Sequence, residues 1–177
     1  AFLESSGKTS PWTTKLPRVT ATGICCFGDT LFVAQHGGWS EFRPDEEPRH
    51  NFDIPALQGA STTVIAADAE RIMVGTQGNG LVEINRTTRE VRHIHEAHGL
   101  TDDWVTAIEL VGPDDALVGT FVGGLLQVRS GHAKQVGLPG ICISRIFSHE
   151  GRTWVGSLQG VAEWRKGRLI APEWAKW

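Results

Sequence analysis

One short phrase recurs four times in this chain, and it limits the possible folds more than any other feature. Each copy ends an apolar run with valine and a small residue, then passes a glycine-containing turn and enters a second apolar run. Val33, Val74, Val118 and Val155 mark the equivalent place and are 41, 44 and 37 residues apart. The phrase is typical of a buried strand, a tight turn and a returning strand. A strand repeat with this period indicates a propeller or a related array.

Each repeat divides into four short strands, of which the first two are the most apolar and the last two more polar. This gradient fits a blade whose inner strands are covered on both faces while its outer strands meet water. We therefore predict an all-β fold, a β-propeller-like array of about four four-stranded antiparallel blades. A β-helix or a leucine-rich horseshoe would need a shorter period, and an immunoglobulin-type sandwich would not repeat the phrase.

The repeats define a division of the chain into three parts. We predict an N-terminal extension with an entering strand at residues 1–17, propeller repeats at 18–171, and a tryptophan-rich tail at 172–177. The four repeats span about 18–58, 59–99, 100–137 and 138–171.

The N-terminal segment supplies one strand more than four blades need. Residues 12–15 match an outermost strand, yet residues 168–171 already fill that place in the fourth repeat. An unpaired strand edge is a site for strand addition by a partner. We therefore predict that the two terminal segments, with their apolar side chains, dock onto a larger assembly.

Composition excludes some partners. The net charge of −3 and the lack of a basic run argue against nucleic acid. No apolar run approaches the roughly 18 residues that a membrane span needs, so any membrane association would be peripheral to a membrane complex. The chain begins with Ala1 rather than methionine, as a processed protein or a fragment would. We expect an extracytoplasmic, periplasmic location, with a cytoplasmic one as the alternative.

Two segments carry a family resemblance. Gly99–Leu125, with its acidic turn and its Val-Gly-Thr and Gly-Gly-Leu steps, and residues 137–157, with Trp154 before Val-Gly, resemble the two-component regulator propeller repeat. The resemblance covers residues 16–170, nearly the whole chain. It implies a ligand-sensor-like propeller of the kind that lies outside the cytoplasm and is tied to a signalling domain.

The residues that could carry chemistry each have a structural explanation. His93, His95 and His98 have metal-ligand character, but they lie on and after an outer strand where chance histidines meet water. The acidic pairs at 102–103 and 114–115 fit turns, where aspartate is favoured. No nucleophile, zinc or phosphate-loop motif is present. We therefore expect no enzyme activity, no cofactor and no metal site.

Three cysteines do not form a disulfide framework. We interpret Cys25, Cys26 and Cys142 as small core residues, because free cysteine is commonly buried. A bridge from Cys142 to either of the others requires the first and last blades to meet.

Aromatic residues near turns are the candidate partner or ligand contacts. Trp39 and Trp104 follow turns that emerge on one rim of a propeller, where exposed aromatics are favoured anchors, unless they are tucked between blades. The full candidate set is Phe2, Leu3, Trp39, Asp102, Trp104, Phe121, Trp174 and Trp177. Gly38, Gly80 and Gly124, which follow the turns, are expected to adopt conformations poorly open to other residues.

The function predicted from these features is a non-catalytic β-propeller interaction module. Its leading form is an extracytoplasmic accessory or scaffold subunit that binds other proteins in a membrane-associated complex. One alternative is the small-ligand sensor module of a signalling system. Another is a propeller lyase or hydrolase, which would need histidine and carboxylate groups gathered on one rim.

Overall fold

The computed structural model describes residues 20–172, which form four antiparallel sheets of four strands each. The first sheet contains β1 (Gly23–Phe27), β2 (Thr30–Gln35), β3 (Gly38–Phe42) and β4 (Arg49–Asn51). The second contains β5 (Thr62–Ala67), β6 (Arg71–Thr76), β7 (Leu81–Asn85) and β8 (Val91–Ile94). The third contains β9 (Val105–Gly112), β10 (Asp115–Thr120), β11 (Leu125–Arg129) and β12 (His132–Gly137). The fourth contains β13 (Ile143–His149), β14 (Arg152–Ser157), β15 (Gly160–Arg165) and β16 (Arg168–Ile170).

Consecutive strands pair in every sheet, so each sheet is an up-and-down meander like a propeller blade. Two short 3₁₀ turns, η2 (Pro55–Leu57) and η3 (Glu96–His98), follow the outermost strands β4 and β8. The predicted all-β fold of four four-stranded blades is confirmed, and each sheet falls within one of the predicted repeats.

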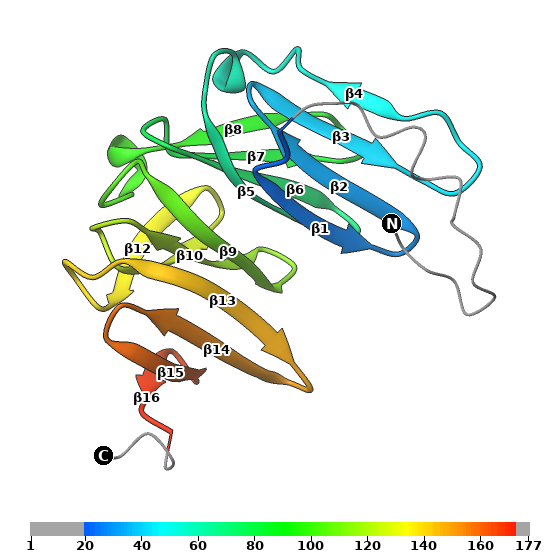
Figure 1. Ribbon diagram of the computed structural model, residues 1–177. Coiled ribbons are helices and arrows are strands. Elements are labelled where there is room, and N and C mark those ends of the chain that lie inside the picture. The colour runs from blue at the N-terminus through cyan, green and yellow to red at the C-terminus, as the bar shows by residue number, and fades with distance from the viewer. Residues whose placement is uncertain (1–19, 173–177) are drawn as a thin grey trace.

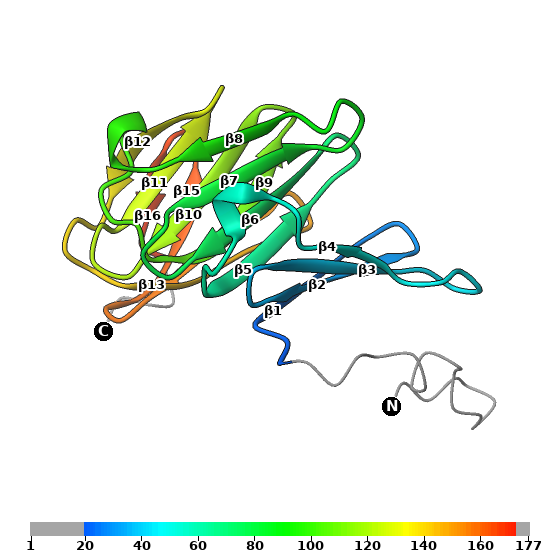
Figure 2. The ribbon, with the colours of Figure 1, turned by 90° about the horizontal axis from the view of Figure 1, so that it is seen from above.

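The four sheets follow one another around an arc, with β1, β5, β9 and β13 on its inner side (Figure 1). Seen from above, the sheet β1–β4 lies at one end of this stack (Figure 2). Within residues 20–172 no strand of the first sheet pairs with a strand of the last. The arc is therefore open, and its two end sheets each have a face without a neighbouring sheet.

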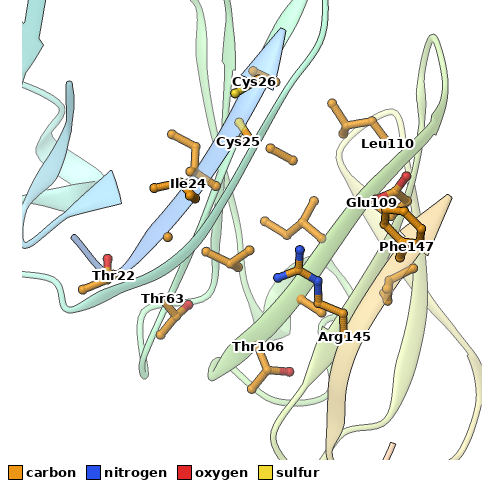
Figure 3. A pocket seen from close by; sticks show the side chains of 18 of the residues that line it. Thr22, Ile24, Cys25, Cys26, Thr63, Thr106, Glu109, Leu110, Arg145 and Phe147 are labelled. Atoms are coloured by element: carbon orange, nitrogen blue, oxygen red, sulfur yellow. The ribbon is translucent and has the colours of Figure 1, made fainter. Parts of the chain in front are cut away.

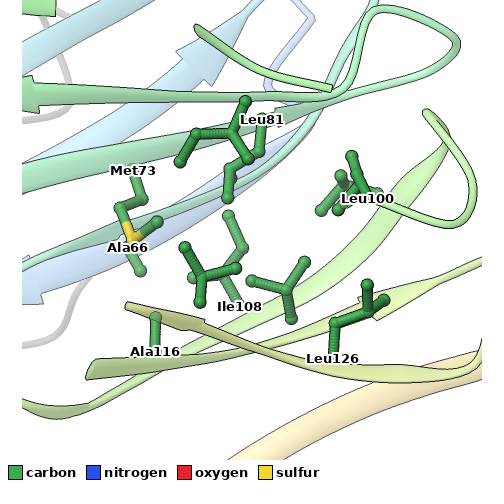
Figure 4. Packing of buried hydrophobic residues seen from close by; sticks show 11 residues of the cluster. Ala66, Met73, Leu81, Leu100, Ile108, Ala116 and Leu126 are labelled. Atoms are coloured by element: carbon green, nitrogen blue, oxygen red, sulfur yellow. The ribbon is translucent and has the colours of Figure 1, made fainter. Parts of the chain in front are cut away.

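The hydrophobic core lies between successive sheets as three clusters. Phe32, Trp39 and Ile72 belong to the cluster between the first and second sheets. Met73, Leu81 and Leu126 belong to the next, which Figure 4 shows between β6–β7 and the third sheet. Ile143, Val155 and Leu117 belong to the third cluster. Apolar burial at roughly 25 cal/mol per Å² makes these contacts the main force that holds the sheets together.

A glycine in the recurring phrase lets successive sheets approach closely. A Cβ added at Gly75 would lie 2.6 Å from Cγ1 of Val105, and one at Gly119 would lie 2.5 Å from Cγ2 of Ile143. In both cases the β-branched residue comes from the inner strand of the following sheet. The absence of a side chain at this glycine therefore leaves a space that a residue of the next blade fills. We call this space the glycine socket.

The predicted behaviour of the turn glycines holds at two of three positions. Gly80 and Gly124 have φ values of +69° and +84°, in the left-handed region that favours glycine. Gly38 does not have a positive φ, so the prediction of a special turn conformation is wrong there. It needs glycine for another reason, because a Cβ at that position would lie 2.1 Å from the Asn51 carbonyl oxygen.

All three cysteines are free. Cys25 and Cys142 are half-buried, whereas Cys26 is exposed. The prediction that all three are core residues is therefore wrong for Cys26. Because the first and last sheets do not meet, the bridge that would have required their contact is not formed.

Candidate functional site

A pair of stacked aromatic rings lies on one rim of the arc. The Trp104 and Phe121 rings have centroids 4.2 Å apart and planes tilted by 17°. Trp104 precedes β9, and Phe121 follows β10, so two separate connections of the third sheet bring the rings together. Phe121 is 42% exposed and its neighbour Val122 is 54% exposed. Three adjacent side chains thus present apolar surface to solvent.

Asp102 fixes the geometry of this rim. One of its carboxylate oxygens accepts a hydrogen bond from the Trp104 amide at 3.0 Å, and the other accepts one from the Val122 amide at 2.7 Å. The Phe121 amide also donates to the Trp104 carbonyl oxygen at 2.9 Å. Charge-assisted hydrogen bonds of this kind hold both connections in one position. Three predicted contacts, Asp102, Trp104 and Phe121, therefore form one cluster, which we call the rim cluster together with Val122.

Neighbouring backbone stiffens the rim cluster further. The Thr101 hydroxyl donates to the Gly123 carbonyl oxygen at 3.1 Å, and a Cβ at Gly123 would lie 2.4 Å from that hydroxyl. The Asp103 carbonyl oxygen accepts hydrogen bonds from the amides of Gly78 and Gly80 in the second sheet. The rim is thereby tied to two blades.

The other predicted contacts do not join the rim cluster. Trp39 is fully buried in the core between the first two sheets, and its indole Nε1 donates to Glu41 at 3.2 Å. It packs between blades, which was the alternative explanation for this residue, and its burial contradicts a rim role. Phe2, Leu3, Trp174 and Trp177 lie outside the described residues.

The three predicted histidines lie close together, but their ring nitrogens form hydrogen bonds with backbone groups. The ring centroids of His93 and His95 are 5.0 Å apart, and those of His95 and His98 are 4.5 Å apart. His93 Nε2 donates to the Asn79 carbonyl oxygen, while ring nitrogens of His95 and His98 accept amide hydrogen bonds around η3. Across residues 20–172 no group of three or more potential ligands could hold a metal ion. The His95 and His98 side chains cap the 3₁₀ turn η3, and His93 binds the connection between β6 and β7.

A groove of about 380 Å³ runs along the inner strands of all four sheets. Figure 3 shows Ile24 and Cys25 on one of its sides and Arg145 and Phe147 on another. A hydroxyl recurs at the same place in each inner strand, at Thr22, Thr63, Thr106 and Ser144.

Three of these hydroxyls connect successive sheets, and that of Thr22 lies 2.9 Å from the Thr62 hydroxyl of β5. The Thr63 hydroxyl donates to the Val105 carbonyl oxygen at 2.6 Å, and the Thr106 hydroxyl donates to the Ile143 carbonyl oxygen at 2.5 Å. The sequence prediction missed the groove, although the recurring hydroxyl at the start of each inner strand was a signal that could have indicated it.

Glu109 and Arg145 add charge to this groove. Burial raises the pKa of Glu109 above its ordinary value, against hydrogen bonds from Ser148 and the positive charge of Arg145, which lower it. Desolvation thus outweighs the favourable partners. Burial likewise raises the pKa of the Cys25 thiol to about 12, which leaves this cysteine a protonated and unreactive group. The groove offers hydroxyl, carboxyl and guanidinium groups for hydrogen bonding to a polar ligand.

Comparisons with known proteins support the fold. The chain is similar to the extracellular domain of BT4673 from B. thetaiotaomicron, described as a one-component system, with 14% identity and a TM-score of 0.68 over 84% of this chain and 21% of that one. It is similar to BamB from Moraxella catarrhalis, with 18% identity and a TM-score of 0.57 over 80% of this chain and 42% of that one. It is also similar to the WD40 β-propeller domain of Doa1, with 17% identity and a TM-score of 0.59 over 84% of this chain and 49% of that one.

The chain therefore spans about a fifth of the length of the BT4673 structure and under half of each of the other two. No protein-family model and no curated protein matches the sequence, and identities this low establish the propeller fold alone. No helix in residues 20–172 is long and apolar enough to cross a bilayer.

Proposed function

We propose that this chain is a non-catalytic propeller module that binds another protein through its rim cluster. The observation that carries the proposal is the stack of half-buried Trp104 on exposed Phe121, whose two connections Asp102 holds together. Aromatic side chains with fixed positions are favoured anchors of protein interfaces, because little conformational entropy is lost when they bind.

We further propose an extracytoplasmic location for this module, as an accessory or scaffold subunit within a membrane-associated complex. The similarity in fold to the extracellular domain of BT4673 supports the location. The resemblance of the repeats to those of two-component regulator propellers points the same way. Fractionation of source cells with an antibody to the chain tests it, and recovery in the cytoplasmic fraction would contradict it.

Comparison of two truncations and two substitutions tests the binding surface. Phe121→Ala should abolish copurification of the partner, whereas Val91→Ala, at an exposed apolar residue on β8 away from the rim, should not. Deletion of residues 1–10 and 172–177 tests the earlier prediction that the terminal segments dock. Full binding by Phe121→Ala with loss in the truncated chain would move the binding site from the rim to the termini.

A second candidate function is small-ligand sensing by the groove. A volume of about 380 Å³ lies within the range of roughly 300–1,000 Å³ usual for ligand pockets. Thermal shift measurements with a panel of small polar molecules should find a ligand that raises the melting temperature of the native chain. The same ligand should have no effect on Arg145→Ala. No stabilising ligand, or equal stabilisation of both chains, would remove this candidate.

A further inference from the structure

The outward face of the last blade exposes apolar side chains beside charged ones. We use "end face" for the face of the fourth sheet that has no neighbouring sheet, formed by Arg145, Phe147, Trp154, Gly156 and Val161. Phe147 is 51% exposed and Val161 is 43% exposed. A solenoid or stacked array usually ends in a repeat with a polar outer face, which keeps it soluble.

The glycine socket of the last blade is empty. Gly156 occupies the position of Gly75 and Gly119 in the recurring phrase. The three atoms nearest to a Cβ at Gly156 all belong to its own sheet, and the closest is the Ser144 hydroxyl oxygen at 3.4 Å. In the two preceding blades that space is filled by Val105 and Ile143 of the following sheet. The end face is thus shaped for an inner strand that residues 20–172 do not supply.

The recurring hydroxyl of the inner strands also lacks a partner in the last blade. Thr63 and Thr106 donate to carbonyl oxygens at the start of the next inner strand. Ser144, the equivalent residue of β13, is exposed and has no hydrogen-bond partner among the described residues. The next inner strand would bring a carbonyl oxygen to this hydroxyl.

An arginine near the end face is a third group that contacts the next sheet in an earlier blade but not in the fourth. Arg71 in the second sheet has a 6% exposed side chain, and it donates to the carbonyl oxygens of Gly112 and Asp115 in the third sheet. Arg152 holds the equivalent place in the fourth sheet and pairs with Glu163, as Arg71 does with Glu83. Its side chain is 52% exposed. It donates to both carboxylate oxygens of Glu163 and lies over the Trp154 ring, and it contacts no following sheet within residues 20–172.

The first blade carries the complementary surface. Ile24 on β1 is 66% exposed, Cys26 is exposed on the same face, and Ala21 ahead of the strand is exposed as well. By its place in the repeat, Ala21 is equivalent to Val105 and Ile143, which fill the glycine sockets. The part of this face further from the axis, with Val33 and Phe42, is buried, so the free surface is that of the inner strand.

We propose that the end face binds the β1 strand of a second copy of this chain, and that two copies close one ring. Because four blades span about half of the Doa1 propeller, two arcs related by a twofold axis would supply eight blades. Eight is within the range of four to eight blades that propellers usually have. In a twofold arrangement the end face of each copy contacts the β1 strand of the other. No end face is then left to bind a third copy.

The repeat predicts which side chains meet across this contact. The Cys25 thiol is hydrogen-bonded to the Ala67 backbone, and Glu109 is hydrogen-bonded to Ser148. Phe147 is equivalent to Cys25 and Glu109, and Cys26 is equivalent to Ala67 and Ser148. Phe147 of one copy therefore lies against Cys26 of the other.

Light scattering coupled to size exclusion tests the proposal on the full 177-residue chain. We expect twice the mass of one chain, and Phe147→Glu should convert it to single chains. Val91→Glu, which also replaces an exposed apolar residue but on the second blade, should leave the mass doubled. A single-chain mass at every concentration, assemblies larger than two copies, or a doubled mass retained by Phe147→Glu would overturn the proposal.

Cross-linking tests the register independently. Phe147→Cys under mild oxidation should give a reducible species of two chains, and addition of Cys26→Ser should abolish it. A dimer whose cross-link persists without Cys26 would show that another surface forms the contact. Binding of the rim partner by Phe147→Glu separates this proposal from the function proposed above, because the rim cluster does not include the end face.

Discussion

Two glycines with the same backbone conformation but different surroundings offer a sharp test of the turn geometry. Gly124 and Gly140 have φ values of +84° and +75°. A Cβ at Gly124 would lie 2.2 Å from the Leu138 carbonyl oxygen, whereas nothing lies within 4 Å of one at Gly140. Gly140→Ala thus isolates the cost of left-handed backbone, and Gly124→Ala adds a steric clash with backbone that cannot rotate away.

The two costs can be estimated separately. Left-handed backbone costs a non-glycine residue roughly 1–2 kcal/mol. Overpacking adds about 1–3 kcal/mol. We therefore expect the free energy of unfolding to fall by about 1–3 kcal/mol more in Gly124→Ala than in Gly140→Ala. For a chain of this size each kcal/mol lowers the melting temperature by about 2–4 °C.

Urea denaturation followed by circular dichroism measures both variants under the same conditions. The comparison should be made with the Phe147→Glu variant as the parent chain, so that self-association does not enter the unfolding equilibrium. Equal losses in the two variants would refute the steric part of the reasoning. A neutral Gly124→Ala would refute the turn geometry itself.

Three further predictions follow from buried polar groups and cysteines. Arg71→Met should lower the free energy of unfolding by about 3–5 kcal/mol in urea denaturation, because it leaves buried Glu83 and two carbonyl oxygens short of a partner. Since burial raises the pKa of Glu109, the folded chain binds its proton more tightly than the unfolded chain does, and stability from this group is lost as the pH rises above the ordinary value of 4.5. Denaturation at several pH values should show a smaller loss in Glu109→Gln, and an identical pH profile would contradict the shift. In the Phe147→Glu parent chain, where no second copy covers Cys26, Cys26 should react with a thiol reagent at mildly alkaline pH much faster than Cys25, whose pKa is about 12, and Cys26→Ser should remove the fast phase.

Most of the fold was predictable because its information is local and repeated. The Val-Gly-Thr phrase sets a strand, a turn and a second strand within a few residues, and its period reports the blade. Trp104 and Phe121 were both among the predicted contacts, and both are aromatic residues near turns. Their mutual stacking was not predictable, since it depends on where Asp102 binds two connections that are 20 residues apart.

Other features depend on how blades stack, which no single repeat reveals. Trp39 and Trp104 both follow turns, yet Trp39 enters the core because its strand turns that residue toward the second sheet. Gly38 needs glycine because of the neighbouring strand β4 and not because of its own φ. The burial of Trp39 and the need for glycine at position 38 are thus both set by residues of other strands.

Arg71 and Arg152 show how the position of a blade, rather than its sequence, sets the environment of a residue. Both begin the second strand of a blade, and both pair with a buried glutamate on the third strand. They differ in the presence of a following sheet, and the exposed fraction of the side chain rises from 6% to 52% without one. The fourth blade carries the glycine of the recurring phrase and the exposed side chains of Phe147 and Val161 on the face that has no neighbouring sheet within residues 20–172. The same glycine receives the inner strand of the following sheet in the second and third blades, and the proposed contact with a second copy would use it in the fourth.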